Sequence, residues 1–200
     1  MFCVVKKSIS HLKYLLLLAA FSTAFFAFCF GYFSLYLNIS DSIPKGLYVL
    51  EKRLPKKNEL ALFCLNEEFS VIAKERKYLS NGVCNGLAPI GKKAVAKAGD
   101  LVKINRFGTY VDNVRIKRSQ PLKFDPNGEL MPQRFFEKLL DNGEYLFVAE
   151  KIYSFDSRYF GIVGKENIIG TIKPVFTYEK GHLFSDLSDW LWINLINQGL

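Results

Sequence analysis

The hydrophobic pattern of this 200-residue chain begins with one long uncharged stretch. Residues 14–37 contain no charged side chain. As a helix of roughly 24 residues, rising about 1.5 Å per residue, this stretch is long enough to cross a hydrocarbon layer of about 30 Å. It lacks the polar stripe that a surface helix of a globular core carries. A cleaved signal peptide would be shorter and would end in small residues. The pattern therefore predicts a retained transmembrane anchor over 14–37.

After this stretch the pattern changes to short apolar or alternating runs, which are typical of β-strands. The expected strands cover residues 47–50, 60–65, 94–98, 101–104, 145–149 and 168–176. A tight hairpin is expected over 111–116, and a single helix over 67–79. These runs predict a mainly β domain over residues 38–182.

The end of the chain, residues 183–200, has a different pattern. Leu187, Trp190, Leu191 and Leu195 lie at helical spacing, which predicts an amphipathic tail. Two placements stay open for it, because an amphipathic helix with tryptophans can lie on a membrane surface or dock on the β domain.

The charges before the apolar stretch predict how the chain is oriented across the membrane. Lys6, Lys7 and Lys13 precede the apolar stretch, and no acidic residue occurs before Asp41. Because positive flanks stay on the cytoplasmic side, residues 1–13 are expected in the cytoplasm and the β domain outside it. The net charge of +8 is spread along the chain with acidic residues close by. We expect a solvated surface and no direct nucleic-acid binding.

Two of the four cysteines, Cys64 and Cys84, flank the expected helix in the outward domain. Cysteine pairs in an oxidising compartment usually form disulfides, and closing a loop of about 20 residues contributes roughly 3 kcal/mol. No histidine lies near either residue, so the alternative of a metal site is disfavoured. We expect a disulfide between them, and we expect neither a metal nor a cofactor.

A candidate nucleophile, Ser42, follows the apolar stretch in the run Ser42-Ile43-Pro44-Lys45-Gly46. Pro44 restricts the backbone here and Gly46 permits a bend, so a simple turn into a strand is the alternative interpretation. The chain has only two histidines, His11 and His182. A Ser-His-Asp arrangement would require His182 as its base.

A lysine is the other candidate base, provided that burial makes its amine neutral. The run over residues 92–100 offers one. If it is extended, Lys92 shares a face with Ala94 and Ala96, whereas Lys93 and Lys97 face the other way. Lys92 is therefore the candidate base, although lysine pairs at a strand entrance are commonly just exposed.

Three runs, in this order along the chain, resemble the type I signal peptidase family of serine-lysine proteases. The similarity is greatest to its conjugative-transfer branch, the TraF-type peptidases. Residues 42–48 resemble the nucleophile box of that branch, and residues 92–100 resemble the lysine box. Residues 154–161 resemble the Ser-x-Asp-Ser-Arg-Tyr-x-Gly box. The resemblance implies a signal-peptidase-like β domain behind the anchor.

The resemblance also implies a set of roles. Ser42 would be the nucleophile and Lys92 the general base. The supporting residues would be Ser40 for the oxyanion, Ser154 for orienting the lysine, and Asp156 with Arg158 for bracing the site. The Ser-Ile-Pro spacing is one residue shorter than the Ser-Met-x-Pro of the general family, which leaves Ser40 open as the nucleophile.

The implied protein is a serine endopeptidase of the bacterial inner membrane with a periplasmic catalytic domain. Its expected substrate is a membrane-inserted precursor, a conjugative pilin, which is cleaved with or without cyclisation. Other components of the conjugation machinery are expected partners. Two alternatives stay open: a general signal peptidase for exported preproteins, and a non-catalytic anchored assembly factor.

Overall fold

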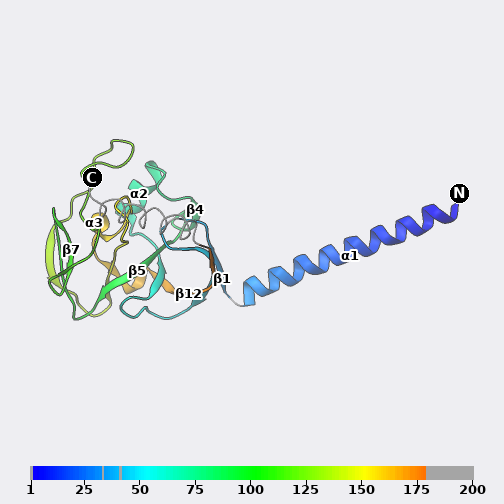
Figure 1. Ribbon diagram of the computed structural model, residues 1–200, viewed down its shortest axis with the longest axis horizontal. Helices are drawn as coiled ribbons and strands as arrows, with labels where there is room; N and C mark the ends of the chain where they lie inside the picture. The colour runs from blue at the N-terminus through cyan, green and yellow to red at the C-terminus, as the bar shows by residue number, and fades with distance from the viewer. Residues whose placement is uncertain (1, 33, 41, 179–200) are drawn as a thin grey trace, which may run out of the picture.

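The computed structural model describes residues 2–32, 34–40 and 42–178. The predicted tail over 183–200 and His182 lie outside these residues. Helix α1 (Phe2–Tyr32) leads into a β domain and extends away from it in Figure 1. Within the described part of the chain, no helix is both long and apolar enough to cross a membrane. The expected transmembrane anchor over 14–37 therefore finds no support in the structure.

The β domain contains two sheets whose strands are all antiparallel to their neighbours (Figure 1). The larger sheet has seven strands in the order β1 (Leu35–Asn38), β2 (Lys45–Glu51), β12 (Ile168–Tyr178), β3 (Leu60–Phe63), β5 (Ile90–Lys97), β10 (Glu144–Phe147) and β11 (Val163–Gly164). The smaller sheet has four, in the order β8 (Val114–Arg115), β7 (Gly108–Val111), β6 (Leu101–Asn105) and β9 (Phe136–Leu139). The predicted mainly β domain is thus confirmed.

The remaining elements are short and lie between the strands. They are α2 (Glu67–Glu75), β4 (Asn81–Cys84), α3 (Ser157–Phe160) and a 3₁₀ turn over Lys165–Asn167. Helix α2 begins where the side chain of Asn66 accepts a hydrogen bond of 3.1 Å from the backbone N–H of Phe69. It ends at Glu75, earlier than the expected residue 79, and Lys77 already has a positive φ of 55°.

Strand β12 joins the two halves of the larger sheet. It pairs with β2 on one side and with β3 on the other, although β2 and β3 are consecutive in the chain. Gly46 permits the pairing with β2, because a Cβ atom at this position would lie 2.1 Å from the backbone oxygen of Phe176. Without β12, the β1–β2 hairpin has no strand to join it to the rest of the sheet.

The core lies on the faces of the larger sheet and under the smaller one. Its centre is aromatic: the rings of Phe63 and Phe147 stack with centroids 4.3 Å apart, and Phe160 meets Phe63 edge-on. All three side chains are buried. Such a packed aromatic centre gives strands β3 and β10 a fixed separation.

The predicted strands and hairpin match observed elements to within a few residues, but four strands were not predicted. They are β1, β4, β9 and β11. The omission of β1 matters for the site, because residues 35–37 were assigned to the anchor. They instead pair with β2 in the sheet, with Leu37 opposite Leu47.

Candidate active site

Ser42 and Lys92 are brought together by the fold. The Nζ atom of Lys92 lies 2.7 Å from the Oγ atom of Ser42, although 50 positions separate the two residues in the chain. Ser42 lies in the loop between β1 and β2, whereas Lys92 belongs to β5. Ser40, the alternative nucleophile, makes no such contact among the hydrogen bonds of the described residues. The geometry therefore favours Ser42 over Ser40.

Lys92 projects from the buried face of β5. It is 2% exposed, and Ala94 and Ala96 on the same face are fully buried, whereas Lys93 is exposed. The alternation expected from the sequence is thus observed. Burial lowers the pKa of the Lys92 amine from 10.5 to about 8, and the nearby charge of Asp156 partly opposes this shift. A large fraction of the amine is therefore neutral at mildly alkaline pH.

Asp156 and Arg158 form a buried ion pair that organises the segment before α3. The Nε atom of Arg158 lies 2.8 Å from Oδ1 of Asp156, and its Nη2 atom lies 2.9 Å from Oδ2. The carboxylate also accepts hydrogen bonds from the backbone N–H groups of Ala149 and Arg158. The guanidinium further donates to five backbone carbonyls, those of residues 118, 120, 151, 152 and 154. These bonds fix the loop that carries Ser154.

Ser154 lies beside the pair of Ser42 and Lys92 but does not bond to either. Its side chain is buried, and its Oγ atom has no hydrogen-bond partner among the described residues. All three residues line the same cavity. Buried hydroxyls are normally paired, so the unpaired hydroxyl of this cavity-lining residue is unusual.

Ser40 is exposed, and its hydroxyl is bonded to Asn38. Its Oγ atom donates a hydrogen bond of 2.7 Å to Oδ1 of Asn38. An oxyanion-binding role for Ser40 therefore requires its hydroxyl to leave Asn38. The sequence analysis did not identify Asn38.

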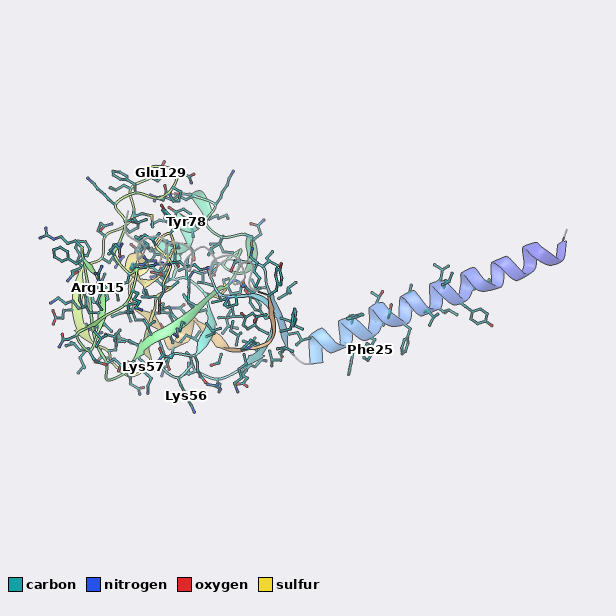
Figure 2. The ribbon with its side chains drawn as sticks, in the orientation of Figure 1. Phe25, Lys56, Lys57, Tyr78, Arg115 and Glu129 are labelled. Atoms are coloured by element: carbon teal, nitrogen blue, oxygen red, sulfur yellow. A yellow bond between two sulfur atoms is a disulfide. The ribbon has the colours of Figure 1, made fainter. Side chains whose placement is uncertain are left out.

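A cavity of about 320 Å³ opens beside Ser42. Aromatic side chains form much of its wall, namely Tyr78, Phe124, Tyr153, Phe155 and Tyr159. One side of the wall is a loop over residues 122–131. Leu122 donates its backbone N–H to the hydroxyl of Tyr159 at 3.0 Å, and the hydroxyl of Tyr78 bonds to Asp125. Figure 2 shows Tyr78 and Glu129 at the same end of the domain.

The predicted disulfide between Cys64 and Cys84 is present. It closes a loop that contains α2 and residues 76–79, which line the cavity. The disulfide therefore restrains one wall of the site. Within the described part of the chain, no group of three histidine, cysteine, aspartate or glutamate side chains is placed to hold a metal ion.

Comparison with known proteins assigns the chain to a family. It matches the family described as "Signal peptidase, peptidase S26" over residues 8–177 and belongs to it. The plasmid transfer protein TraF of Escherichia coli is 35% identical over 147 residues, which cover 71% of this chain and 82% of that protein. The conjugal transfer protein TraF of Agrobacterium fabrum is 30% identical over 148 residues, with coverages of 72% and 82%.

A solved signal peptidase I from Enterococcus faecalis is also similar, with 17% identity and a TM-score of 0.34. The match covers 62% of this chain and all of that one. The family and the relatives confirm the resemblance to signal peptidases and to their conjugative-transfer branch. The chain therefore has a peptidase role.

Proposed function

We propose that this protein is a serine endopeptidase in which Ser42 is the nucleophile and Lys92 the general base. The observation that carries the proposal is the 2.7 Å contact between Oγ of Ser42 and Nζ of a lysine that is only 2% exposed. A lysine acts as a base only when it is neutral, and burial supplies that condition.

The reaction follows from this contact. The neutral Lys92 amine accepts the proton of Ser42 as Oγ attacks the carbonyl carbon of the scissile peptide bond. The resulting ammonium then donates that proton to the leaving amine, the carbon–nitrogen bond breaks, and an acyl-enzyme forms on Ser42. Water resolves the ester by hydrolysis, or the amino terminus of the substrate resolves it by cyclisation.

The supporting residues have separate roles in this proposal. The backbone N–H of Ser42 and the hydroxyl of Ser40 stabilise the oxyanion once Ser40 is released from Asn38. The unpaired hydroxyl of Ser154 orients the Lys92 amine. Asp156 and Arg158 brace the loop behind Ser154 through their buried ion pair.

The proposed substrate is a membrane-inserted pilin precursor of a conjugation system. The names of the relatives, plasmid transfer and conjugal transfer proteins, support this choice. A direct test is mass spectrometry of the pilin from cells that lack the protein, complemented with the parent or with Ser42→Ala. We expect the unprocessed precursor to accumulate without the protein and with Ser42→Ala. Full processing by Ser42→Ala would reject the proposal.

We further propose that α1 holds the protein at the inner membrane with the β domain in the periplasm. The apolar side chains of Leu15, Leu16, Leu17 and Leu18 are each more than 60% exposed, and a disulfide suits an oxidising compartment. A reporter that is active only outside the cytoplasm, fused after Leu200, is expected to give signal. Signal from a cytoplasm-only reporter at the same position would reverse this assignment.

A further inference from the structure

The loop that carries Ser42 runs from the end of β1 to the start of β2. Residues 39–40 and 42–44 lie between the two strands, so the strand pairing that ends at Asn38 and Gly46 does not satisfy their backbone polar groups. Buried backbone carbonyls need other partners. In this loop, one side chain contacts three of these carbonyls.

That side chain belongs to Asn38, the last residue of β1, which is 2% exposed. Its Nδ2 group lies within hydrogen-bond distance of the backbone oxygens of Ser40 at 3.0 Å, Ile43 at 3.0 Å and Pro44 at 3.1 Å, so its two hydrogens are shared among three acceptors. Its Oδ1 atom accepts from the backbone N–H of Ser40 at 3.2 Å and from the Ser40 hydroxyl at 2.7 Å. Both ends of the loop are therefore tied to one amide group, and Ser42 lies between them.

Only one orientation of the Asn38 amide fits these contacts. An amide NH₂ group carries two hydrogens and its oxygen carries none. If the amide were turned over, Oδ1 would face three carbonyl oxygens, and the NH₂ group would face the backbone N–H of Ser40. The bonding pattern thus requires an asparagine and not an aspartate of the same shape.

Two further features make the loop a rigid support once Asn38 holds it. The side chain of Ile43 is 6% exposed and packs in the core. Pro44 has a restricted φ, and its carbonyl also accepts a hydrogen bond of 2.6 Å from the Tyr48 hydroxyl. Since reacting groups tolerate little displacement, such support determines how well Ser42 meets Lys92.

We propose that Asn38 is a positioning residue for catalysis, whose side-chain amide holds the nucleophile loop so that Ser42 meets Lys92. This inference rests on the proposed function of Ser42 and Lys92. Asn38 does not line the cavity beside Ser42, so it acts through the loop and not through contact with the substrate.

The test uses the full-length protein and p-nitrophenyl acetate, a small activated ester that needs no specificity pocket. Release of p-nitrophenol above the background of Ser42→Ala reports acylation of Ser42, and it is measured from pH 6 to about pH 10 to include the neutral form of a lysine base.

The variants are Asn38→Ala and Asn38→Asp. Asn38→Asp keeps the size of the side chain but places an acceptor against three carbonyl oxygens. The matched control is Ser119→Ala, which removes a fully buried hydroxyl bonded within the smaller sheet region.

We expect both Asn38 variants to remain folded by circular dichroism and to lose acylation roughly 10²-fold. Their residual rates should rise with hydroxide concentration and lack the inflection near pH 8 that we expect of the parent, since burial lowers the pKa of Lys92 to about 8. Ser119→Ala should lose stability without losing that inflection. A purely structural role for Asn38 would lower stability as in Ser119→Ala and leave the shape of the pH profile unchanged.

The outcomes separate this inference from the proposed function. If the parent releases p-nitrophenol no faster than Ser42→Ala, the proposed function fails. If Ser42→Ala is inactive but Asn38→Asp keeps the parental rate and pH profile, only the role of Asn38 is overturned. It is also overturned if both Asn38 variants fail to fold, because the side chain then serves the fold and not the nucleophile.

Discussion

Asp156 and Arg158 form an ion pair from which solvent is fully excluded, with Nε of Arg158 2.8 Å from Oδ1 of Asp156. The pair is only two positions apart in the chain, yet the guanidinium of Arg158 also reaches carbonyls near residue 120. It therefore joins the loop before α3 to the segment that leads into the cavity wall. This arrangement suits a bracing role, and in the proposed reaction the proton transfer falls to Lys92.

The first prediction concerns this ion pair. Arg158→Ala leaves the Asp156 carboxylate buried without its partner, so the free energy of unfolding should fall by about 3–5 kcal/mol. Arg53→Ala is the control, because Arg53 pairs with Glu51 and Glu59 at a partly exposed site, where a loss of about 0–1 kcal/mol is expected. Urea unfolding followed by circular dichroism measures both. An equal loss in the two variants would contradict the bracing role.

The second prediction concerns the residues proposed for the chemistry. Ser42→Ala and Lys92→Ala should each abolish precursor processing, and the double variant should be hardly worse than either one, because nucleophile and base act as a unit. Lys93→Ala is the matched control, since its side chain is exposed on the other face of β5, and it should process normally. An inactive Lys93→Ala beside an active Lys92→Ala would overturn the assignment of the base.

The third prediction concerns the pH dependence of activity. Because burial lowers the pKa of Lys92 to about 8, processing should be slow at pH 6 and rise through about pH 8 as the amine loses its proton. Arg158 contributes to lowering this pKa and Asp156 opposes it. A folded Arg158 variant should therefore shift the rise to higher pH. A parental rate that is flat between pH 6 and 9 would exclude Lys92 as the base.

The fourth prediction concerns the stability cost of burying Lys92. Between pH 8 and 10.5 the unfolded chain binds more protons at this residue than the folded chain does, so stability should increase with pH across this window. Lys92→Met should be more stable than the parent below pH 8, by roughly 3 kcal/mol. Thermal unfolding at pH 7 and at pH 10.5 should show this advantage shrinking. A variant that is less stable than the parent at pH 7 would contradict the burial argument.

The fifth prediction concerns the disulfide. Cys64 and Cys84 should resist alkylation until the protein is reduced, and replacing both by alanine should cost roughly 2–4 kcal/mol of unfolding free energy. Because the bridged loop supplies residues 76–79 of the cavity wall, reduction should also raise KM more than it lowers kcat. Free thiols at both positions in protein isolated from cells would exclude the bridge.

The alternation in β5 could be predicted because it depends on local spacing alone. Lys92 is buried among Ala94 and Ala96, and Lys93 is exposed, as the period of two in a strand requires. The pairing of Cys64 with Cys84 could likewise be predicted from the compartment and the cysteine count. The proximity of Ser42 to Lys92 came from the family resemblance, since no local pattern relates residues 50 positions apart.

Other parts of the fold could not be predicted from the sequence pattern. Strand β1 continues the apolar run of α1, so the sequence pattern does not show where the helix ends and the strand begins. Between them lies Ser34, which has a φ of 48° although it is neither glycine nor proline. The contacts of Asn38 could not be predicted because its partners are backbone carbonyls of a loop. Sequence patterns do not show where those carbonyls point. The cavity wall over residues 122–131 depends on Tyr78 and Tyr159, which are remote in sequence.

The place of β12 in the larger sheet has a consequence for when the protein becomes active. The hairpin that carries Ser42 is joined to the strands that carry Lys92 only through β12, among the strand pairs that the structure describes. During synthesis, both residues leave the ribosome more than 70 positions before Ile168–Tyr178 does. The nascent chain thus contains Ser42 and Lys92 before it contains the strand that joins their parts of the sheet. In the proposed mechanism, Ser42 and Lys92 are therefore aligned for proteolysis only after Ile168–Tyr178 has been synthesised.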